Sequence, residues 1–275
     1  MAELDQDPVR TFELEKDERI RGYPEDAKWQ VLSRGWMRRA FEQKYMYNFS
    51  WMGRPIIQTP VDMVAMQELI WQVKPDLIIE TGIAHGGSLI MYASMLALID
   101  YSEAVEFGKV VDPKITKRHV LGIDIDIRAH NQAAIEAHPM AHRIEMIQGS
   151  SIDSEVVSRV RECSKGYERV MVVLDSNHTH DHVLAELEAY GSLVSKGSYC
   201  VVFDTVVEDL PKGMFKDRPW DRGNNPKTAV WEYLKALSER KEIDAQGLVV
   251  EFEIDKEVQN KLLLTAALDG YLRRI

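Results

Sequence analysis

Cysteine is scarce in this chain: two residues among 275, Cys163 and Cys200, stand far apart. No disulfide framework is indicated, and we expect a reducing, cytoplasmic setting. No apolar run approaches the eighteen or so residues of a membrane span. The charged first twenty residues also lack the apolar stretch of a secretory signal. We therefore expect neither membrane insertion nor secretion.

Positive charge is also in short supply, because 34 lysines and arginines face 44 acidic residues and leave a formal net charge of −10. Proteins that bind nucleic acid usually present a basic surface, so a nucleic-acid partner is not expected. The hydrophobic share of 45% and the charged share of 28% are typical of globular proteins. A small molecule is the expected ligand.

The N-terminal segment differs in composition from the rest of the chain. Nine acidic and five basic residues fall within the first thirty, with little apolar periodicity. Residues 1–28 are interpreted as a charged arm that is loosely ordered or packs only in an oligomer. Residues 29–275 are interpreted as one domain, and a homo-oligomer is expected.

Apolar strands alternate with amphipathic helices along most of the domain. Thr59 and Pro60 are typical of a helix start, and Pro75 of a helix end. Five strand–helix units and two late strands predict an α/β fold with a mainly parallel sheet and helices on both faces. The predicted strands cover 76–80, 119–125, 143–149, 170–176, 198–204, 248–255 and 261–268, and further helices are predicted at 29–49, 88–101, from about 128, and at 154–164, 182–194 and 226–238.

Polar side chains stand at or just after the ends of the first five predicted strands. They are Glu80, Asp124, Ser150, Asp175 and Asp204. The carboxyl ends of parallel strands meet at one edge of a sheet, where ligands bind in such folds. The five residues therefore predict a ligand crevice.

A glycine-rich turn, IIETGIAHGGS at 78–88, runs from the first of these strands into a helix. Glycines permit close approach of a ligand to the backbone, but the spacing is not the G-x-G-x-x-G of dinucleotide enzymes. The Glu80 carboxylate would repel a pyrophosphate and attract an ammonium group. S-adenosylmethionine therefore suits the turn better than NAD. The expected contacts in the turn are Glu80, Thr81, Gly82, Gly86, Gly87 and Ser88.

The nucleoside end of that cofactor has its own candidate residues. Asp124 is placed to accept hydrogen bonds from both ribose hydroxyls, and Asp126 is the rival acceptor. Ser150 and Ser151 are candidates for the adenine edge, although Ser151 suits a helix N-cap equally well. Asp175 is expected to contact the cofactor as well.

Three of the eight histidines fall in VVLDSNHTHDH at 172–182. His178, His180 and His182 do not share one face of a strand or helix, and no cysteine cluster completes a tetrahedral set, so a zinc site is not expected. A Mg²⁺ site on Asp175 and Asp204 is favoured, because Mg²⁺ prefers oxygen ligands. Further oxygens would come from Thr205, or from Glu208 or Asp209. Two acids that only cap helices or turns remain the alternative.

His178 lies three residues past Asp175, at the mouth of the same crevice. A neutral imidazole there would take the proton of a substrate hydroxyl. A role in the metal shell, or a hydrogen bond to the substrate, is the alternative. His180 and His182 are assigned to the start of the next helix.

Long segments of the chain resemble the cephalosporin hydroxylase/rhamnosyl O-methyltransferase family. They are residues 47–88, VLGIDIDIRAHN, VVLDSNHTHDHVLAEL and GSYCVVFDTVVEDLP. The resemblance implies a Rossmann-like, seven-stranded methyltransferase sheet with a C-terminal antiparallel strand, S-adenosylmethionine in the crevice and Mg²⁺. It also implies metal binding by Asp175 and Asp204, with His178 as the base. Relatives often carry two consecutive acidic or amide ligands after the fifth strand, where this chain has FDT, so the third ligand is open.

The predicted function is Mg²⁺- and S-adenosylmethionine-dependent O-methylation of a hydroxylated sugar or natural product. Loops around Tyr47 and over 208–228 are expected to wall the acceptor. A hydroxylase, an NAD-dependent oxidoreductase and a silent partner protein are the alternatives. The candidate acceptor contacts are Trp51, Arg54, Arg218, Trp220, Asn224 and Asn225, with oligomer or core packing as the alternative for the two tryptophans.

Overall fold

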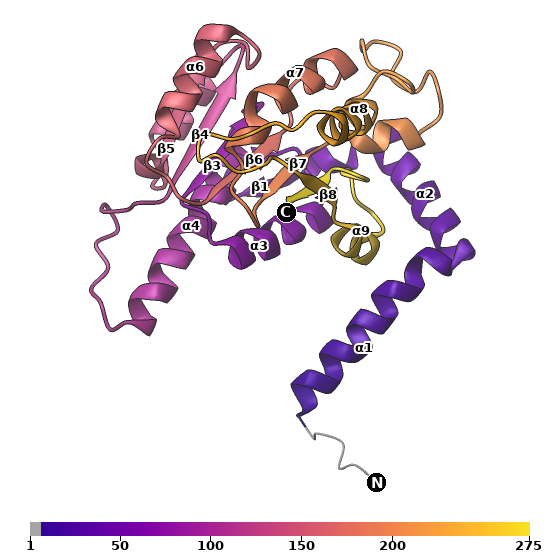
Figure 1. Ribbon diagram of the computed structural model, residues 1–275, viewed down its shortest axis with the longest axis horizontal. Coiled ribbons are helices and arrows are strands. Elements are labelled where there is room, and N and C mark those ends of the chain that lie inside the picture. The colour runs from indigo at the N-terminus through magenta and orange to yellow at the C-terminus, as the bar shows by residue number, and fades with distance from the viewer. Residues whose placement is uncertain (1–6) are drawn as a thin grey trace.

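A seven-stranded sheet lies at the centre of the fold in this computed structural model, which describes residues 7–275 (Figure 1). The strand order is β5-β4-β3-β6-β7-β9-β8. The first five of these strands in chain order are parallel, and β9 is antiparallel to both of its neighbours. The predicted fold class is confirmed. The strands are β3 (Leu77–Thr81), β4 (His119–Asp124), β5 (Ile144–Gln148), β6 (Val170–Leu174), β7 (Tyr199–Val202), β8 (Phe252–Ile254) and β9 (Tyr271–Arg274).

The order of strands creates a switch point between β3 and β6. The chain builds outward from β3 through β4 to β5, and then returns to place β6 on the other side of β3. The connections after β3 and β6 therefore leave the sheet in opposite directions, which opens a crevice at the carboxyl ends of these two strands.

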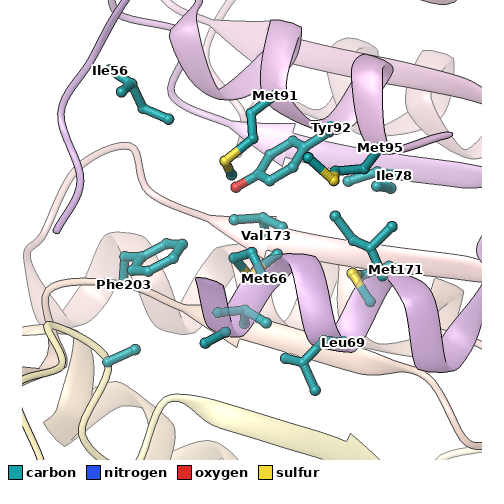
Figure 2. Packing of buried hydrophobic residues seen from close by; sticks show 14 of the residues in the cluster. Ile56, Met66, Leu69, Ile78, Met91, Tyr92, Met95, Met171, Val173 and Phe203 are labelled. Atoms are coloured by element: carbon teal, nitrogen blue, oxygen red, sulfur yellow. The ribbon is translucent and has the colours of Figure 1, made fainter. Parts of the chain in front are cut away.

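Helices cover both faces of the sheet, because each strand of its centre is apolar on both sides. One face packs α3 (Pro60–Val73), α4 (Gly87–Glu106) and α5 (Ala129–Glu136), and the other packs α6 (Ser154–Cys163), α7 (His180–Tyr190) and α8 (Pro226–Glu239). Figure 2 shows Met66 and Leu69 of α3, and Met91 and Tyr92 of α4, packed around Val173 of β6. Burying this apolar surface holds the switch point rigid.

α4 meets the length and composition expected of a membrane-spanning helix, but half of its most apolar stretch is buried inside the fold. Its side chains Leu89, Ile90, Tyr92 and Leu96 are wholly buried. Core packing therefore accounts for the apolar character of this helix.

Two further helices and a hairpin precede the sheet. α1 (Pro8–Gly22) projects from the body of the fold, and α2 (Ala27–Glu42) leads into the hairpin of β1 (Phe49–Trp51) and β2 (Arg54–Ile56) (Figure 1). The expectation of a loosely ordered arm is wrong for Pro8–Gly22, while residues 1–6 lie outside the described part. The Asp7 carboxylate caps α1 by accepting a hydrogen bond from the Val9 amide at 2.9 Å, and ion pairs between side chains three and four residues apart support the helix.

The last predicted strand is also misplaced. Residues 261–268 form the end of α9 (Lys256–Leu262) and a buried loop, and the strand that pairs with β7 is β9. The loop is apolar because it packs over α3. There, the Asp62 carboxylate accepts hydrogen bonds from the Thr265 hydroxyl at 2.5 Å and the Ala266 amide at 2.9 Å.

Candidate active site

Two adjoining cavities open at the carboxyl edge of the sheet, with volumes of about 650 and 230 Å³. Gly82, Ala84, Asp175 and Ser176 line both cavities, so the end of β3 and the end of β6 form the ridge between them. The predicted crevice is therefore present at the switch point. A two-part ligand can span it, with one end in each cavity.

The glycine turn after β3 needs glycine at Gly82 because another strand end crowds it. Gly82 has a φ of +92°, and a Cβ there would lie 2.1 Å from the carbonyl oxygen of Asp175. Asp124 stabilises the same turn, since its Oδ2 accepts hydrogen bonds from the amides of Ile83 at 2.8 Å and Ala84 at 3.2 Å. Asp124 therefore shapes the turn as well as lining the smaller cavity.

The second half of the turn is held from outside by the β1–β2 hairpin. A Cβ on Gly87 would lie 2.2 Å from the Pro55 carbonyl oxygen. The Arg54 guanidinium donates to the His85 carbonyl oxygen at 2.6 Å and to Asn131 Oδ1 at 3.0 Å. Arg54 is thus placed to position the glycine turn, and it does not line the cavity in which it was expected to contact the acceptor.

Trp51 also lies away from the larger cavity. Its indole N–H donates to the Ser94 hydroxyl of α4 at 2.9 Å, and its ring packs against the core. The alternative of core packing for this residue fits the structure better than the expected acceptor contact.

Glu80, at the end of β3, is fully buried. The Ser88 hydroxyl donates to its Oε2 at 2.8 Å, while Oε1 has no hydrogen-bond partner within residues 7–275. Burial raises the pKa of Glu80 to about 8, and the negative charge of Asp124 adds to the shift. Glu80 lines neither cavity, but it lies behind Ser88, which lines the larger one, so its charge can act on a cationic group bound there.

Three possible ligand atoms for a cation gather beneath the larger cavity. One atom each from Asp175, His178 and Asp204 lies within 4.8 Å of the others, and His178 Nε2 is 3.1 Å from Asp204 Oδ2. Burial and the nearby Asp204 carboxylate raise the pKa of Asp175 well above its usual range. A cation bound there would relieve the repulsion between the two carboxylates.

Asp204 faces this cluster from an unusual backbone conformation. It follows β7 with a φ of +55°, in the left-handed region that aspartate tolerates better than most residues. Such conformations often accompany functional sites. The next residue, Thr205, is fully buried, and its hydroxyl donates to the Ala266 carbonyl oxygen at 3.4 Å, so the structure does not bring it to the cluster as a ligand.

The other expected oxygen ligands are engaged elsewhere. Glu208 Oε2 accepts hydrogen bonds from the Gly223 amide at 2.7 Å and the Asn225 side chain at 2.6 Å. Asp209 pairs with the Lys227 ammonium. His178, rather than an acid of the loop, is therefore the third candidate ligand of the cluster, beside Asp175 and Asp204.

The loop over 208–228 contributes two of its four candidate acceptor contacts to the larger cavity. Arg218 and Trp220 line it; the Arg218 guanidinium carbon lies 5.2 Å from the centre of the Trp220 ring, and that ring meets His178 edge-on at 4.7 Å. Asn224 and Asn225 do not line it. Asn224 accepts the His180 amide hydrogen bond at 2.9 Å, and Asn225 caps α8, so both serve the loop itself.

The smaller cavity contains all the predicted nucleoside contacts. Asp124, Ser150, Ser151 and Asp175 line it, together with His182. Asp126 is exposed and 3.9 Å from Arg128, which makes it the weaker candidate for the ribose. His182 was expected only at the start of α7, and sequence spacing gave no sign that it returns to this cavity.

Gln58 is a cavity residue that sequence reasoning missed. It lines the larger cavity at 5% exposure, and neither its side-chain oxygen nor its nitrogen has a hydrogen-bond partner within the described chain. Buried amides are normally satisfied, so Gln58 is available to a ligand. A single glutamine after an isoleucine pair carries no recognisable motif.

These features define an α/β protein whose crevice can hold a two-part small molecule beside a cation. Residues 43–275 match the model of the Rhamnosyl O-methyltransferase/CmcI family, and the chain belongs to that family of methyltransferases. The resemblance noted in the sequence is confirmed.

Relatives and solved structures agree with this assignment. Rhamnosyl O-methyltransferases from Mycobacterium bovis (strain BCG / Pasteur 1173P2) and Mycobacterium tuberculosis (strain ATCC 25618 / H37Rv) are each 25% identical over 245 residues, 85% of this chain and 83% of theirs. A solved structure described as "cmcI-D160 Mg-SAM" is 16% identical and covers 83% of this chain and 77% of that one, with a TM-score of 0.50. This last likeness concerns the fold alone.

Proposed function

We propose that this protein is an S-adenosylmethionine- and Mg²⁺-dependent O-methyltransferase that acts on a hydroxyl of a sugar or another small natural product. The observation that carries the proposal is the Asp175–His178–Asp204 cluster, which lies against the glycine turn at the junction of the two cavities. Methyl transfer requires the methyl donor and the acceptor hydroxyl to meet, and they can do so only where the two cavities adjoin.

The two cavities divide the methyl donor between them. The smaller cavity, lined by Asp124 and Ser150, suits the nucleoside, and the larger one suits the amino-acid end and the acceptor. Glu80 supports this orientation because it lies behind Ser88, a residue of the larger cavity, where a nearby ammonium group would favour its charged form. Bound S-adenosylmethionine would supply a methyl group on a sulfonium, whose carbon an oxygen nucleophile can attack while the sulfur leaves as a neutral thioether.

The donor set of the cluster fits Mg²⁺, which prefers carboxylate oxygens and keeps several waters. Asp175 and Asp204 would hold the ion. Mg²⁺ bound there would lower the pKa of a neighbouring hydroxyl.

His178 is the proposed base. Asp204 Oδ2, 3.1 Å from Nε2, can accept a hydrogen bond from an N–H on that nitrogen and so hold the ring in place. The lone pair on Nδ1 then takes the proton of the acceptor hydroxyl, while the second oxygen of Asp204 remains for the cation. Fixing both reactants in one crevice supplies a large share of the rate.

The outer wall of the larger cavity favours an acceptor with both an apolar face and hydroxyl groups. Aromatic and thioether side chains alternate there with two cationic ones. Sugar rings stack on aromatic side chains through their C–H faces, and the naming of mycobacterial relatives as rhamnosyl O-methyltransferases supports a sugar hydroxyl. The wall residues are Phe41, Lys44, Met46, Tyr47, Met214, Phe215, Arg218 and Trp220.

Calorimetric titration with S-adenosylhomocysteine and, separately, with NAD, each with and without Mg²⁺, tests the proposal. We expect tight binding of S-adenosylhomocysteine and none of NAD, because the turn lacks the G-x-G-x-x-G spacing that cradles a pyrophosphate. Binding of NAD alone would refute the assignment of the crevice. Binding of S-adenosylhomocysteine without turnover of any hydroxylated acceptor would favour a silent partner protein, and O₂ consumption would favour a hydroxylase.

Cofactor binding should release a proton from Glu80. At pH 6–7 this carboxyl is largely protonated, since its pKa is about 8, and an ammonium beside it favours the charged form. Affinity for S-adenosylhomocysteine should therefore rise with pH, by up to about tenfold per unit, and level off above pH 8. Calorimetry at pH 7 in two buffers of different ionisation enthalpy measures the released proton. Glu80→Gln should abolish this release, and a wild-type affinity independent of pH would contradict the assignment.

We also propose that the protein is a homo-oligomer formed through its N-terminal helices. α1 makes few contacts with its own body and exposes Val9, Phe12 and Leu14, while α2 exposes Val31 and Leu32. α1 carries both acidic and basic side chains, so two copies can pair through opposite charges. Light scattering after gel filtration should show more than one copy, and a variant lacking residues 1–22 should shift toward monomer. A monomeric full-length chain would end the proposal.

A further inference from the structure

A buried carboxylate lies beneath the smaller cavity. Glu186 of α7 is fully buried, and its Oε1 accepts hydrogen bonds from the Ser151 hydroxyl at 2.5 Å and from the Ser176 hydroxyl at 2.6 Å. Both serines line the cavity, but Glu186 does not. A carboxyl group is costly to bury without hydrogen-bond partners, so the contacts of Glu186 call for an explanation beyond the packing of α7.

The contacts fix the hydrogen-bonding character of the two serines. A hydroxyl carries a single hydrogen, and Ser151 and Ser176 both give theirs to Glu186. His182 Nε2 lies 3.1 Å from Ser151 Oγ and 3.4 Å from Glu186 Oε1. Because Ser151 has no hydrogen left, His182 must be the donor of that bond. Toward the cavity, the two hydroxyls can only accept.

The arrangement is held firmly in place. The Tyr190 hydroxyl donates to the Ser151 carbonyl oxygen, and Tyr190 and Leu187 are wholly buried in the second core cluster. The serine hydroxyls therefore have little freedom to turn their hydrogens toward a ligand. Glu186 Oε2 has no hydrogen-bond partner within residues 7–275, so the two serines and His182 all gather on Oε1.

We propose that Glu186 is a positioning residue that makes this cavity selective for a purine with a 6-amino group. With their hydrogens committed to Glu186, Ser151 and Ser176 offer lone pairs that suit the N–H donors of adenine. A 6-oxo purine would place its own lone pairs against theirs, and both sides would lose hydrogen bonds. The inference rests on the proposed function, in which this cavity holds the nucleoside end of the methyl donor.

The test compares two ligands that differ at this one group. S-adenosylhomocysteine and its deaminated form, S-inosylhomocysteine, would each be titrated into the wild type in EDTA, which separates binding from any metal effect. An unpaired polar group in a closed site costs enough that we expect the 6-amino ligand to bind about 10- to 100-fold more tightly.

Glu186→Leu fills a similar volume without an acceptor, so the freed hydroxyls can rotate and donate. The preference for the 6-amino ligand should then fall below about threefold. Glu188→Leu is the matched control on the same helix, because Glu188 is exposed and pairs with Arg240 at 3.0 Å. It should keep the wild-type preference. Ser176→Ala, a milder change, should weaken binding of the 6-amino ligand alone.

The outcomes separate this inference from the function on which it rests. A wild type that binds both ligands equally, or a folded Glu186→Leu variant that keeps the full preference, overturns the inference and leaves the methyltransferase assignment standing. If Glu186→Leu does not fold, the wild-type preference and Ser176→Ala decide in the same way. A wild type that binds neither ligand removes the proposed function, and the inference falls with it.

Discussion

Asp175→Asn should lower methyl transfer by at least about a thousandfold, in line with the several kcal/mol that a bound metal ion supplies to a transition state. The amide keeps the volume of the side chain but removes the negative charge. Asp175 is one of the two carboxylates of the cluster and directly follows β6, at the junction of the cavities. Without it, Mg²⁺ would lose an anionic ligand, and His178 would face an incompletely held substrate.

The measurement is the initial rate as a function of Mg²⁺ concentration, with EDTA as the zero point. Asp181→Asn is the matched control, since Asp181 is an exposed acid in the same histidine-rich segment and lies outside both cavities. It should behave like the wild type. A wild type that turns over fully in EDTA, or an Asp175→Asn variant with unchanged rate, would remove the metal from the mechanism.

His178→Ala should reduce kcat by about 10²- to 10⁴-fold, the range typical of a lost general base. Binding of S-adenosylhomocysteine should change little, because His178 faces Asp204 and Trp220, on the side of the larger cavity assigned to the acceptor. The Mg²⁺ concentration for half-maximal rate should also stay near that of the wild type. A large fall in kcat with unchanged binding of S-adenosylhomocysteine and Mg²⁺ would identify His178 as the base.

A different pattern would assign His178 to the metal. A ring nitrogen of His178 lies within 4.8 Å of a carboxylate oxygen of both Asp175 and Asp204. If His178 holds the cation, its replacement should lower Mg²⁺ affinity together with kcat. His180→Ala is the control, because His180 bonds Thr228 at 2.8 Å and faces Glu232 at 3.2 Å, away from the cluster. Turnover of His178→Ala equal to the wild type would rule out both roles.

The chain order of strands and helices could be inferred from local patterns, because apolar runs and helix caps act over a few residues. Thr59 and Pro60 do begin α3, and β3 does end beside the glycine turn, at Thr81, one residue after Glu80. The same local reasoning failed at residues 261–268. Their apolar side chains belong to a buried loop held by Asp62, some two hundred positions earlier in the sequence, and no local pattern reports such a contact.

The residues around the site show the same difference between what local patterns predict and what long-range contacts decide. Trp51 and Arg54 have the chemistry of ligand contacts, yet the hairpin turns them toward α4 and the glycine turn. Gln58, His182 and Glu186 have no motif, yet packing brings the first two to the cavities and the third beneath one of them. Long-range packing decides which of several suitable side chains meets a ligand.

The order of strands and helices along the chain, the glycine turn and the acids at the strand ends are properties of contiguous residues. The amino-acid sequence alone was therefore enough to indicate the fold class, the crevice and a candidate metal pair. The third candidate ligand of the cluster, the direction of each hydroxyl hydrogen and the division into two cavities depend on segments brought together across the sheet. These features arise only when burial forces distant polar groups to satisfy one another. Folding therefore decided the arrangement in which the chemistry of this methyltransferase is carried out.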